Sequence, residues 1–387
     1  METLKTLFKN NIRQYGMVIA LVSIIILFQI LTEGALLKPL NITNLILQNS
    51  YILILAIGML LVIVAFHIDL SVGSVAAFVG SISAILIVSN KMNFVVAIIL
   101  SLLLGAVVGA WQGFWVAYAK IPAFIVTLAG MLIFRGLTMS VLKGTSLAPF
   151  PVGFQKISSG FIPDFFGGQG IHITTVLIGI VFSVVYIAFE LNDRRTRNKY
   201  KFDVIPMGLL IGKMVAIVAV INAFTYVLST YKGLPNVLVL LFVLIVIYTF
   251  ITNKTIIGRH IYALGGNEKA ARLSGVKTKN MVFWVFVNMG VMSALSGIVF
   301  AARLNAATPK AGTGFELDAI AACFIGGASA SGGIGTVIGA IIGGLVMGVL
   351  NNGMSLMGVG IDWQQAIKGL VLLFAVAFDV FTKSKAS

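Results

Sequence analysis

The chain has 387 residues, of which 59% are hydrophobic and only 10% are charged. Soluble domains average about 45–50% apolar and about 25% charged residues, so this composition excludes a soluble enzyme or binding domain and predicts a protein of the lipid bilayer. The formal net charge is +15, which in a membrane chain is expected from basic cytoplasmic loops, and we predict no nucleic-acid partner.

Long apolar runs without the alternation of β-strands follow one another along the chain. Backbone groups in lipid must be hydrogen-bonded within their own segment, so such runs predict helices, each needing about 20 residues to span the bilayer. The sequence therefore predicts an all-α fold, a polytopic membrane helical bundle with ten to twelve transmembrane segments in one domain over residues 1–387. The runs are 17–32, 44–66, 71–89, 94–118, 123–141, 172–190, 207–230, 236–252, 281–303, 317–331, 334–352 and 363–381.

The number of crossings stays open near the end of the chain. Runs 317–331 and 334–352 are separated only by Gly332 and Gly333, so they are either two spans or one re-entrant element followed by one span. The glycine-rich stretches 71–75 and 334–337 each open an apolar run, which hints at an internal duplication. Two glycine stripes are predicted to pack helices within the chain rather than to signal dimerisation: Gly105, Gly109 and Gly113, and Gly335, Gly339 and Gly343.

Basic residues are distributed unevenly between the two sets of connecting segments. With the N-terminus inside and all twelve runs crossing, the inside segments hold 17 lysines and arginines and the outside segments hold seven. Cytoplasmic loops carry such an excess, so the N- and C-termini are both predicted to be cytoplasmic. The same map makes 142–170 an external loop and 191–206 a basic cytoplasmic loop. It also makes 253–280 a cytoplasmic loop large enough to dock another protein.

Nucleotide binding, metal binding and ion coupling leave recognisable patterns, and none is strong here. Residues 208–214 come nearest to a phosphate-binding loop, but the glycine spacing is wrong and no serine or threonine follows Lys213. The three histidines are scattered and Cys323 is the single cysteine, so no metal site is expected. The acidic residues that touch apolar runs lie near the ends of those runs, which disfavours a proton or sodium relay.

A short polar break separates the second and third runs. In residues 67–74, Asp69 and Ser71 can cap the helix that follows. The alternative is a broken helix beside a water-filled path, where irregular backbone is tolerated. Both interpretations stay open.

Residues 255–276 predict a short helix within the longest inside loop. Asn267 can cap it, Glu268 lies in its favourable first turn, and Gly275 can end it. The loop is either an ordinary solvated connector or a docking element shaped to enter the groove of another protein.

Four stretches carry a resemblance to a known family. They are HIDLSVGSV (67–75), IPAFIVTLAGMLIFRGLT (121–138), GRHIYALGGNEKAARLSGV (258–276) and FIGGASASGGIGTVIGAIIGGLVMGVLNNGM (324–354). Over most of its length the chain resembles the permeases of bacterial ABC importers for ribose, xylose, arabinose, galactose and related sugars. Extra sequence between about 190 and 236 makes it most similar to the longer xylose-type, or multiple-monosaccharide, permeases. His67 departs from the glycine that is common in the family.

The resemblance implies a subunit of the inner or plasma membrane that pairs with a second copy of itself and meets a cytoplasmic ABC ATPase subunit. It would receive D-xylose or a related monosaccharide from an extracytoplasmic sugar-binding protein, and would have no catalytic residue, cofactor or metal. The implied ATPase-coupling residues are Gly258, Arg259, Gly265, Asn267, Glu268, Ala270, Ala271, Arg272 and Gly275. Candidates for the translocation path are Asp69, Ser71, Gly73, Phe124, Thr127, Gly326, Gly327, Ser329, Asn351 and Asn352.

Two other classes of transport remain as alternatives. One is a gradient-coupled sugar carrier that acts without an ATPase, and the other is a passive channel. If the ABC interpretation holds, Ala271→Asp is expected to break the ATPase contact while the permease keeps its own fold.

Overall fold

The computed structural model describes residues 12–202, 204 and 206–384 of the chain. Within these residues every regular element is a helix, and two isolated β-bridges join Leu147 to Ala307 and Phe161 to Pro235. Nine helices of the described part are long and apolar enough to cross a membrane. The predicted all-α membrane bundle is therefore confirmed.

The long helices follow the predicted runs closely. Those with the length and apolarity of spans are α3 (Pro39–Val64), α4 (Val72–Ala84) with the short π-helix η1 (Ile85–Ser89), α5 (Phe94–Ala117), α6 (Ala123–Leu142), α8 (Ile173–Lys199), α9 (Met207–Ser229), α10 (Asn236–Lys254), α13 (Thr278–Leu304) and α15 (Val337–Leu356). The bundle also contains α2 (Ile12–Leu31) and α16 (Ile361–Ser384). The short helices are α7 (Val152–Ser159), α11 (Ile256–Gly266), α12 (Glu268–Leu273) and α14 (Phe315–Ile325).

Run 317–331 is not a full transmembrane helix. It forms α14, whose 11 residues rise only about 16 Å, roughly half of the apolar thickness of a bilayer. The irregular segment 326–336 follows, and the backbone N–H of Gly333 donates to the carbonyl of Val64 at the end of α3. Segment 65–71 similarly interrupts the chain between α3 and α4. The structure thus contains two broken segments, 65–71 and 326–336.

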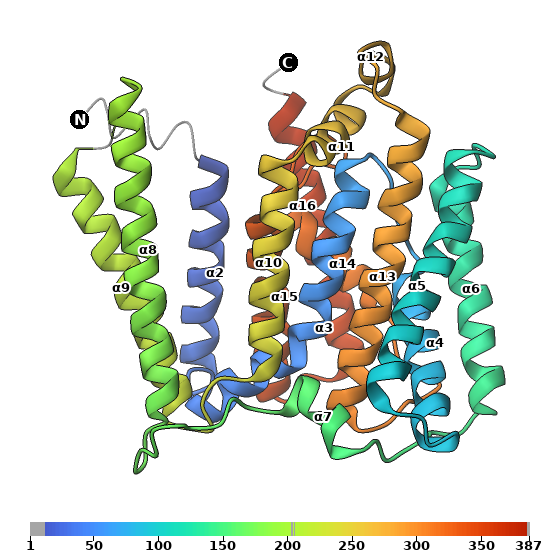
Figure 1. Ribbon diagram of the computed structural model, residues 1–387, viewed down its shortest axis with the longest axis horizontal. Coiled ribbons are helices and arrows are strands. Elements are labelled where there is room, and N and C mark those ends of the chain that lie inside the picture. The colour runs from blue at the N-terminus through green and yellow to red at the C-terminus, as the bar shows by residue number, and fades with distance from the viewer. Residues whose placement is uncertain (1–11, 203, 205, 385–387) are drawn as a thin grey trace.

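The connecting segments lie at two opposite ends of the bundle (Figure 1). Helices α11 and α12, the start of α2 and the end of α8 share one end, which we call the α12 end; α7 lies at the other, the α7 end. Lys5 and Lys9, which contribute to the predicted charge asymmetry, lie outside the described residues. Segment 191–206 is not simply a loop, because α8 continues as helix to Lys199.

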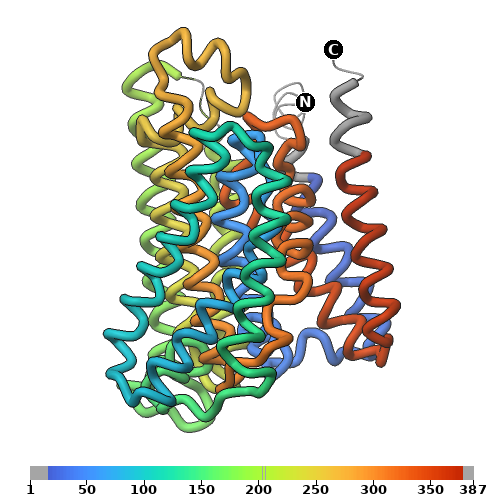
Figure 2. The backbone as a smooth tube through the Cα atoms, turned by 90° about the vertical axis from the view of Figure 1, so that its right-hand side faces the viewer, coloured from blue at the N-terminus to red at the C-terminus, as the bar shows by residue number. Residues whose placement is uncertain are grey.

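Helices α3 and α13 form the buried centre, and α5 packs closely on α13. A Cβ added at Gly109 would lie 2.4 Å from the Phe286 carbonyl oxygen, and one at Gly105 would lie 2.6 Å from that of Gly290. The first glycine stripe therefore packs helices within the chain, as small residues do in membranes. By contrast, α8 and α9 stand at the side of the bundle in Figure 1, and α16 lies at its edge in Figure 2.

Candidate functional site

A cavity of about 960 Å³ opens among the ends of several helices at the α12 end of the bundle. Its walls come from the ends of α3 and α5, the starts of α6 and α13, and α12, with Phe324 of α14 and Ala330 of the second broken segment also contributing. The volume lies at the upper end of what small-molecule sites use, about 300–1,000 Å³. The cavity therefore has room for a small organic solute.

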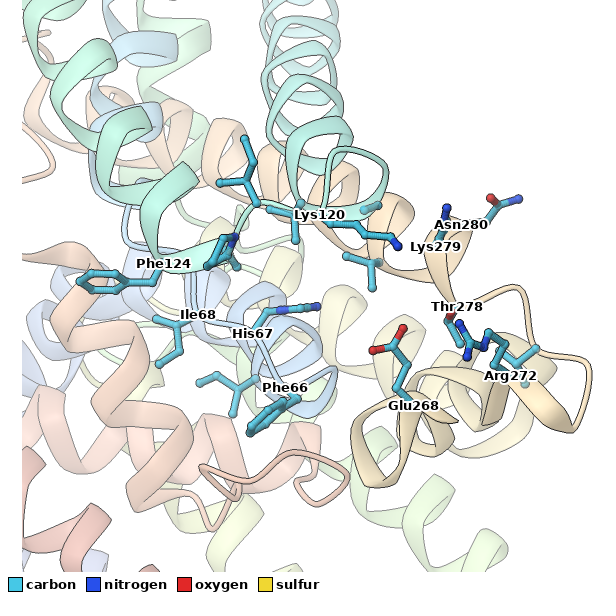
Figure 3. A pocket seen from close by; sticks show the side chains of 18 of the residues that line it. Phe66, His67, Ile68, Lys120, Phe124, Glu268, Arg272, Thr278, Lys279 and Asn280 are labelled. Atoms are coloured by element: carbon cyan, nitrogen blue, oxygen red, sulfur yellow. The ribbon is translucent and has the colours of Figure 1, made fainter. Parts of the chain in front are cut away.

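The floor of the cavity is apolar and partly aromatic. It includes Phe66 and Ile68 of the first broken segment, Phe124 at the start of α6, and Phe324. Phe66 and Phe124 are 62% and 57% exposed, although both residues are large and hydrophobic. Figure 3 shows Ile68 and Phe124 on neighbouring walls. Such a surface offers apolar contact area and few hydrogen-bonding groups to a bound solute.

The rim of the cavity is charged and mostly basic. Lys120, Arg272, Lys277 and Lys279 line it, together with the carboxylate of Glu268. In Figure 3, Glu268 and His67 project toward the same space from opposite walls. The short helix α12 thus contributes both an acidic and a basic side chain to the cavity mouth.

Asp69 and Ser71 form a buried polar network just beyond the first broken segment. Asp69 Oδ1 accepts hydrogen bonds from the Ser71 backbone N–H at 2.8 Å and from Ser71 Oγ at 2.6 Å, and Gln112 Nε2 donates to Ser71 Oγ at 2.6 Å. Asp69 is 2% and Ser71 0% exposed. Thr127 is buried beside them and donates to the Ala123 carbonyl at 2.9 Å. These side chains hold the turn that precedes α4, but neither accepts a hydrogen bond from a backbone N–H of the first turn of α4, so the predicted side-chain cap does not form.

Most of the other path candidates pack helices together. Gly73 lies against the Gly312 backbone, and Gly326 lies against Gly339 of α15. Asn352 exchanges two amide hydrogen bonds with Asn41, at 2.8 and 3.1 Å. Ser329 is buried, and its backbone N–H donates to the Ile334 carbonyl. Gly327 has a positive φ of 78°. Asn351 Oδ1 is buried with no hydrogen-bond partner among the described residues. Of the ten predicted path residues, Phe124 lines the cavity itself.

The 253–280 loop folds into two helices, α11 and α12. Asn267 caps α12 as predicted, its side chain accepting from the Ala270 backbone N–H at 3.0 Å. Thr255 caps α11 by accepting from the Gly258 N–H at 3.2 Å, and an added Cβ at Gly258 would lie 2.4 Å from the Ile251 carbonyl oxygen. Gly275 has a φ of 88°, as expected of a glycine that ends a helix. The loop is an ordered unit on the surface.

The two faces of α12 differ sharply in exposure. Ala271 is 5% exposed, buried by the chain itself, whereas Leu273 is 88% exposed. Arg259, Glu268, Ala270 and Arg272 are also exposed. The Ala271 methyl group therefore cannot be an outward docking contact, and the expectation that Ala271→Asp spares the permease fold does not agree with this burial. Sequence reasoning missed Leu273, although a leucine between Arg272 and Ser274 in a basic loop was a usable signal.

At the α7 end, Asp164 organises the predicted external loop. Its carboxylate accepts hydrogen bonds from the backbone N–H groups of Gly168, Ile173 and Thr174 at 3.0, 3.1 and 3.0 Å, and from Thr174 Oγ1 at 2.8 Å. Hydrogen bonds to the charged form, the one from Gly168 first, hold the pKa of Asp164 well below its usual range. One ionised side chain thus fixes the turn that leads into α8.

Comparisons with known proteins place this chain in a family. A family model described as "Branched-chain amino acid transport system / permease component" matches residues 41–376. The xylose transport system permease proteins XylH of Haemophilus influenzae and Escherichia coli K12 are 40% and 38% identical over 375 and 376 residues, covering 97% of this chain and 98% and 94% of theirs. The ribose import permease protein RbsC of Bacillus subtilis is 35% identical over 372 residues, covering 96% of this chain and 94% of its own.

No solved structure matches the chain. The family match covers most of the chain, and the similarity to the xylose permease of Haemophilus influenzae covers 97% of this chain. They confirm the resemblance carried by the four sequence stretches. The chain therefore belongs to the family of multi-pass membrane permeases of bacterial ABC sugar importers.

Proposed function

We propose that this chain is the membrane-spanning subunit of an ATP-driven importer that carries xylose or a closely related monosaccharide. The observation that carries the proposal is the nearly full-length similarity to the two xylose permeases. The cavity supports it, because an apolar floor and an open mouth suit a solute that is passed on rather than retained. We further propose that selection among sugars rests with an extracytoplasmic binding protein.

We place the α12 end of the bundle in the cytoplasm. The basic segment at the end of α8 and the loop 253–280 both lie there (Figure 1), and cytoplasmic segments are enriched in lysine and arginine. The cavity then opens inward, and the loop that Asp164 organises faces the binding protein. An even number of crossings would leave both termini in the cytoplasm.

The energy would come from a separate ATPase subunit that binds α12. The exposed Leu273 offers an apolar anchor on α12, and the exposed Glu268 and Arg272 lie on the same short helix. The chain is not proposed to bind nucleotide itself, since residues 208–214 lie inside the regular helix α9 and cannot form a phosphate loop.

A second copy of the chain is proposed to complete the pathway, as in the family that the sequence resembles. In support, α6 leaves Phe124, Ile125 and Leu132 more than half exposed, at 57%, 56% and 65%. This face of α6 adjoins the cavity through Phe124. A pair of chains that meet there would enclose a path between them.

Reconstitution in vesicles tests the proposal. With the ATPase on one side and the loaded binding protein on the other, we expect ATP-dependent accumulation of labelled xylose. The chain alone should not accumulate xylose under a proton or sodium gradient and should not allow passive flux. Accumulation by the lone chain under a gradient would favour the carrier, and gradient-independent flux would favour the channel.

A further inference from the structure

Three segments that are distant in sequence meet through their backbones immediately before α12. They are the end of α11 at Gly265, the end of α3 at Val64, and residues 332–335 of the second broken segment. We call this contact the glycine junction. It lies on the route between the proposed ATPase contact and the cavity floor.

The glycine junction has no room for a side chain at Gly265. An added Cβ there would lie 1.6 Å from the Val64 carbonyl oxygen and 2.7 Å from the Gly333 nitrogen, separations that real Cβ atoms do not show. The Gly333 N–H donates to that same carbonyl at 2.9 Å. Gly332 and Gly333 have φ values of 74° and 71°, a region that favours glycine. The close approach therefore depends on glycine in both partners.

A side-chain hydrogen bond adds a second connection between the same segments. Tyr262 Oη donates to the Gly335 carbonyl at 2.7 Å. On the same helix, Ile261 and Leu264 are 3% and 4% exposed, so α11 is held against the bundle by its apolar face. Because close-packed contacts transmit displacement instead of absorbing it, α11 and residues 332–335 are expected to move together.

Both broken segments that the junction holds contribute to the cavity. Val64 is separated by Ala65 alone from Phe66, His67 and Ile68, and residues 332–335 closely follow Ala330. The side chains of Phe66, His67, Ile68 and Ala330 all line the cavity. Toward α12, the junction is connected through a single extended residue, Asn267, which separates α11 from α12. The Asn267 N–H donates to the Ala263 carbonyl at 3.0 Å. Through α11 and the glycine junction, α12 is thus connected to two walls of the cavity.

We propose that the glycine junction transmits movement of α12 to both broken segments, so that one event at the ATPase contact reshapes two walls of the cavity at once. This rests on the proposed function. In this role Gly265, Gly333 and Tyr262 are positioning residues, because they act on the cavity through other residues and do not line it. A purely structural contact would stabilise the fold without affecting how the cavity responds to ATP.

Adjacent glycines supply a matched pair of variants. Gly265→Ala forces the junction apart, whereas an added Cβ at Gly266 would meet no atom of the described residues within 4 Å, apart from its own helix and chain neighbours, so Gly266→Ala is the control. Tyr262→Phe removes one hydroxyl and keeps the ring. It serves as the second test because Gly265→Ala can also lower the stability of the fold.

The measurement is the rate at which a thiol reagent labels the cysteine of Phe124→Cys, in a chain that also carries Cys323→Ala. This labelling rate is compared with and without ATP in the assembled complex. We expect Gly266→Ala to keep the ATP-dependent change in labelling. Tyr262→Phe should reduce this change and the uptake rate roughly fivefold, the factor for one intramolecular hydrogen bond, while its Tm and its co-purification with the ATPase stay close to those of the parent. Gly265→Ala should show no ATP-dependent change in labelling.

Parent-like labelling changes and uptake in Tyr262→Phe would overturn the inference while leaving the proposed function intact. An equal loss in Gly266→Ala would also overturn it, because the effect would then not depend on the junction. If the parent complex itself shows no ATP-dependent uptake, the proposed function fails, and the inference with it.

Discussion

Leu273 and Ala271 lie two residues apart on a helix of only six residues, yet one is 88% and the other 5% exposed. Such a helix is too short for hydrophobic periodicity to fix which side faces the protein, since fewer than two turns are available. The sequence therefore predicted the helix, its cap at Asn267 and its end at Gly275, but not its orientation. That orientation is set by the packing of Ala271 and Val276 on the rest of the chain.

Leu273→Asp should weaken ATPase binding without harming the permease. Burying a leucine contributes about 2 kcal/mol, so its loss corresponds to roughly thirtyfold weaker binding. Co-purification with the ATPase measures the effect, and the Tm of the permease alone should not change. Ala271→Asp is the contrasting variant: it buries an unpaired charge in the permease itself, at a cost of about 3 kcal/mol, and should lower the Tm. A normal ATPase complex with Leu273→Asp would mean that α12 is not the docking element.

Asp164→Asn should loosen the loop around residues 160–174. The neutral amide loses the charge-assisted acceptance of three backbone N–H groups, so hydrogen exchange of Gly168 and Thr174 should accelerate several-fold. The folded-state pKa lies below the ordinary aspartate value of 3.8. The stabilisation is therefore complete above that value and is lost only as the pH falls through the folded pKa.

Consequently, exchange protection in the parent loop, corrected for intrinsic rates, should be the same at pH 7 and pH 5. Asp193→Asn at the opposite end of the bundle is the control, because its exposed pair with Arg197 contributes little. Unchanged exchange in Asp164→Asn would contradict the role of this carboxylate.

At the scale of helices, the apolar runs and the polar break at 67–74 predicted positions well, but they left the form of run 317–331 open. Helix α3 begins at Pro39, five residues before the predicted run, because proline fits the first turn of a helix even where polar residues follow. Run 317–331 ends its helix at Ile325, where Gly326 packs on Gly339 and Gly327 turns the chain with a φ of 78°. Hydropathy continues through both glycines, so composition alone could not separate a half-helix from a span.

Gly290→Ala should separate α5 from α13 and destabilise the bundle. An added Cβ would lie 2.2 Å from the Gly105 carbonyl oxygen, and overpacking of this kind costs about 1–3 kcal/mol. Gly136→Ala on α6 is the matched control, since its Cβ would meet no atom of the described residues within 4 Å beyond its own helix and chain neighbours. Thermal unfolding in detergent should show a lower Tm for Gly290→Ala alone. Equal Tm values would mean that α5 and α13 are not closely packed.

On the scale of the whole molecule, the extra sequence between about 190 and 236 contains the end of α8 and the whole of α9, and these two helices form a hairpin at the side of the bundle. The two helices are joined by the Lys213–Glu190 ion pair at 2.7 Å and by the Asn222–Ser183 hydrogen bond at 2.8 Å. Phe182 packs on Phe242 of α10, with ring centroids 4.8 Å apart. These contacts hold α8 against α9 and against α10 at the side of the bundle.

The final prediction concerns the orientation of this whole bundle. Two exposed residues suit cysteine labelling: Ser159 of α7 at the α7 end and Asn198 of α8 at the α12 end. Ser158, next to Ser159, is fully buried and would not be accessible to a reagent. With Cys323 replaced by alanine, Ser159→Cys should react with an impermeant maleimide added outside intact cells. Asn198→Cys should react only after permeabilisation, because basic segments remain in the cytoplasm. Labelling of both sites from outside would mean that α8 does not carry the chain across the membrane between them. Reversed labelling would put the cavity mouth outside, where a cytoplasmic ATPase could not reach α12.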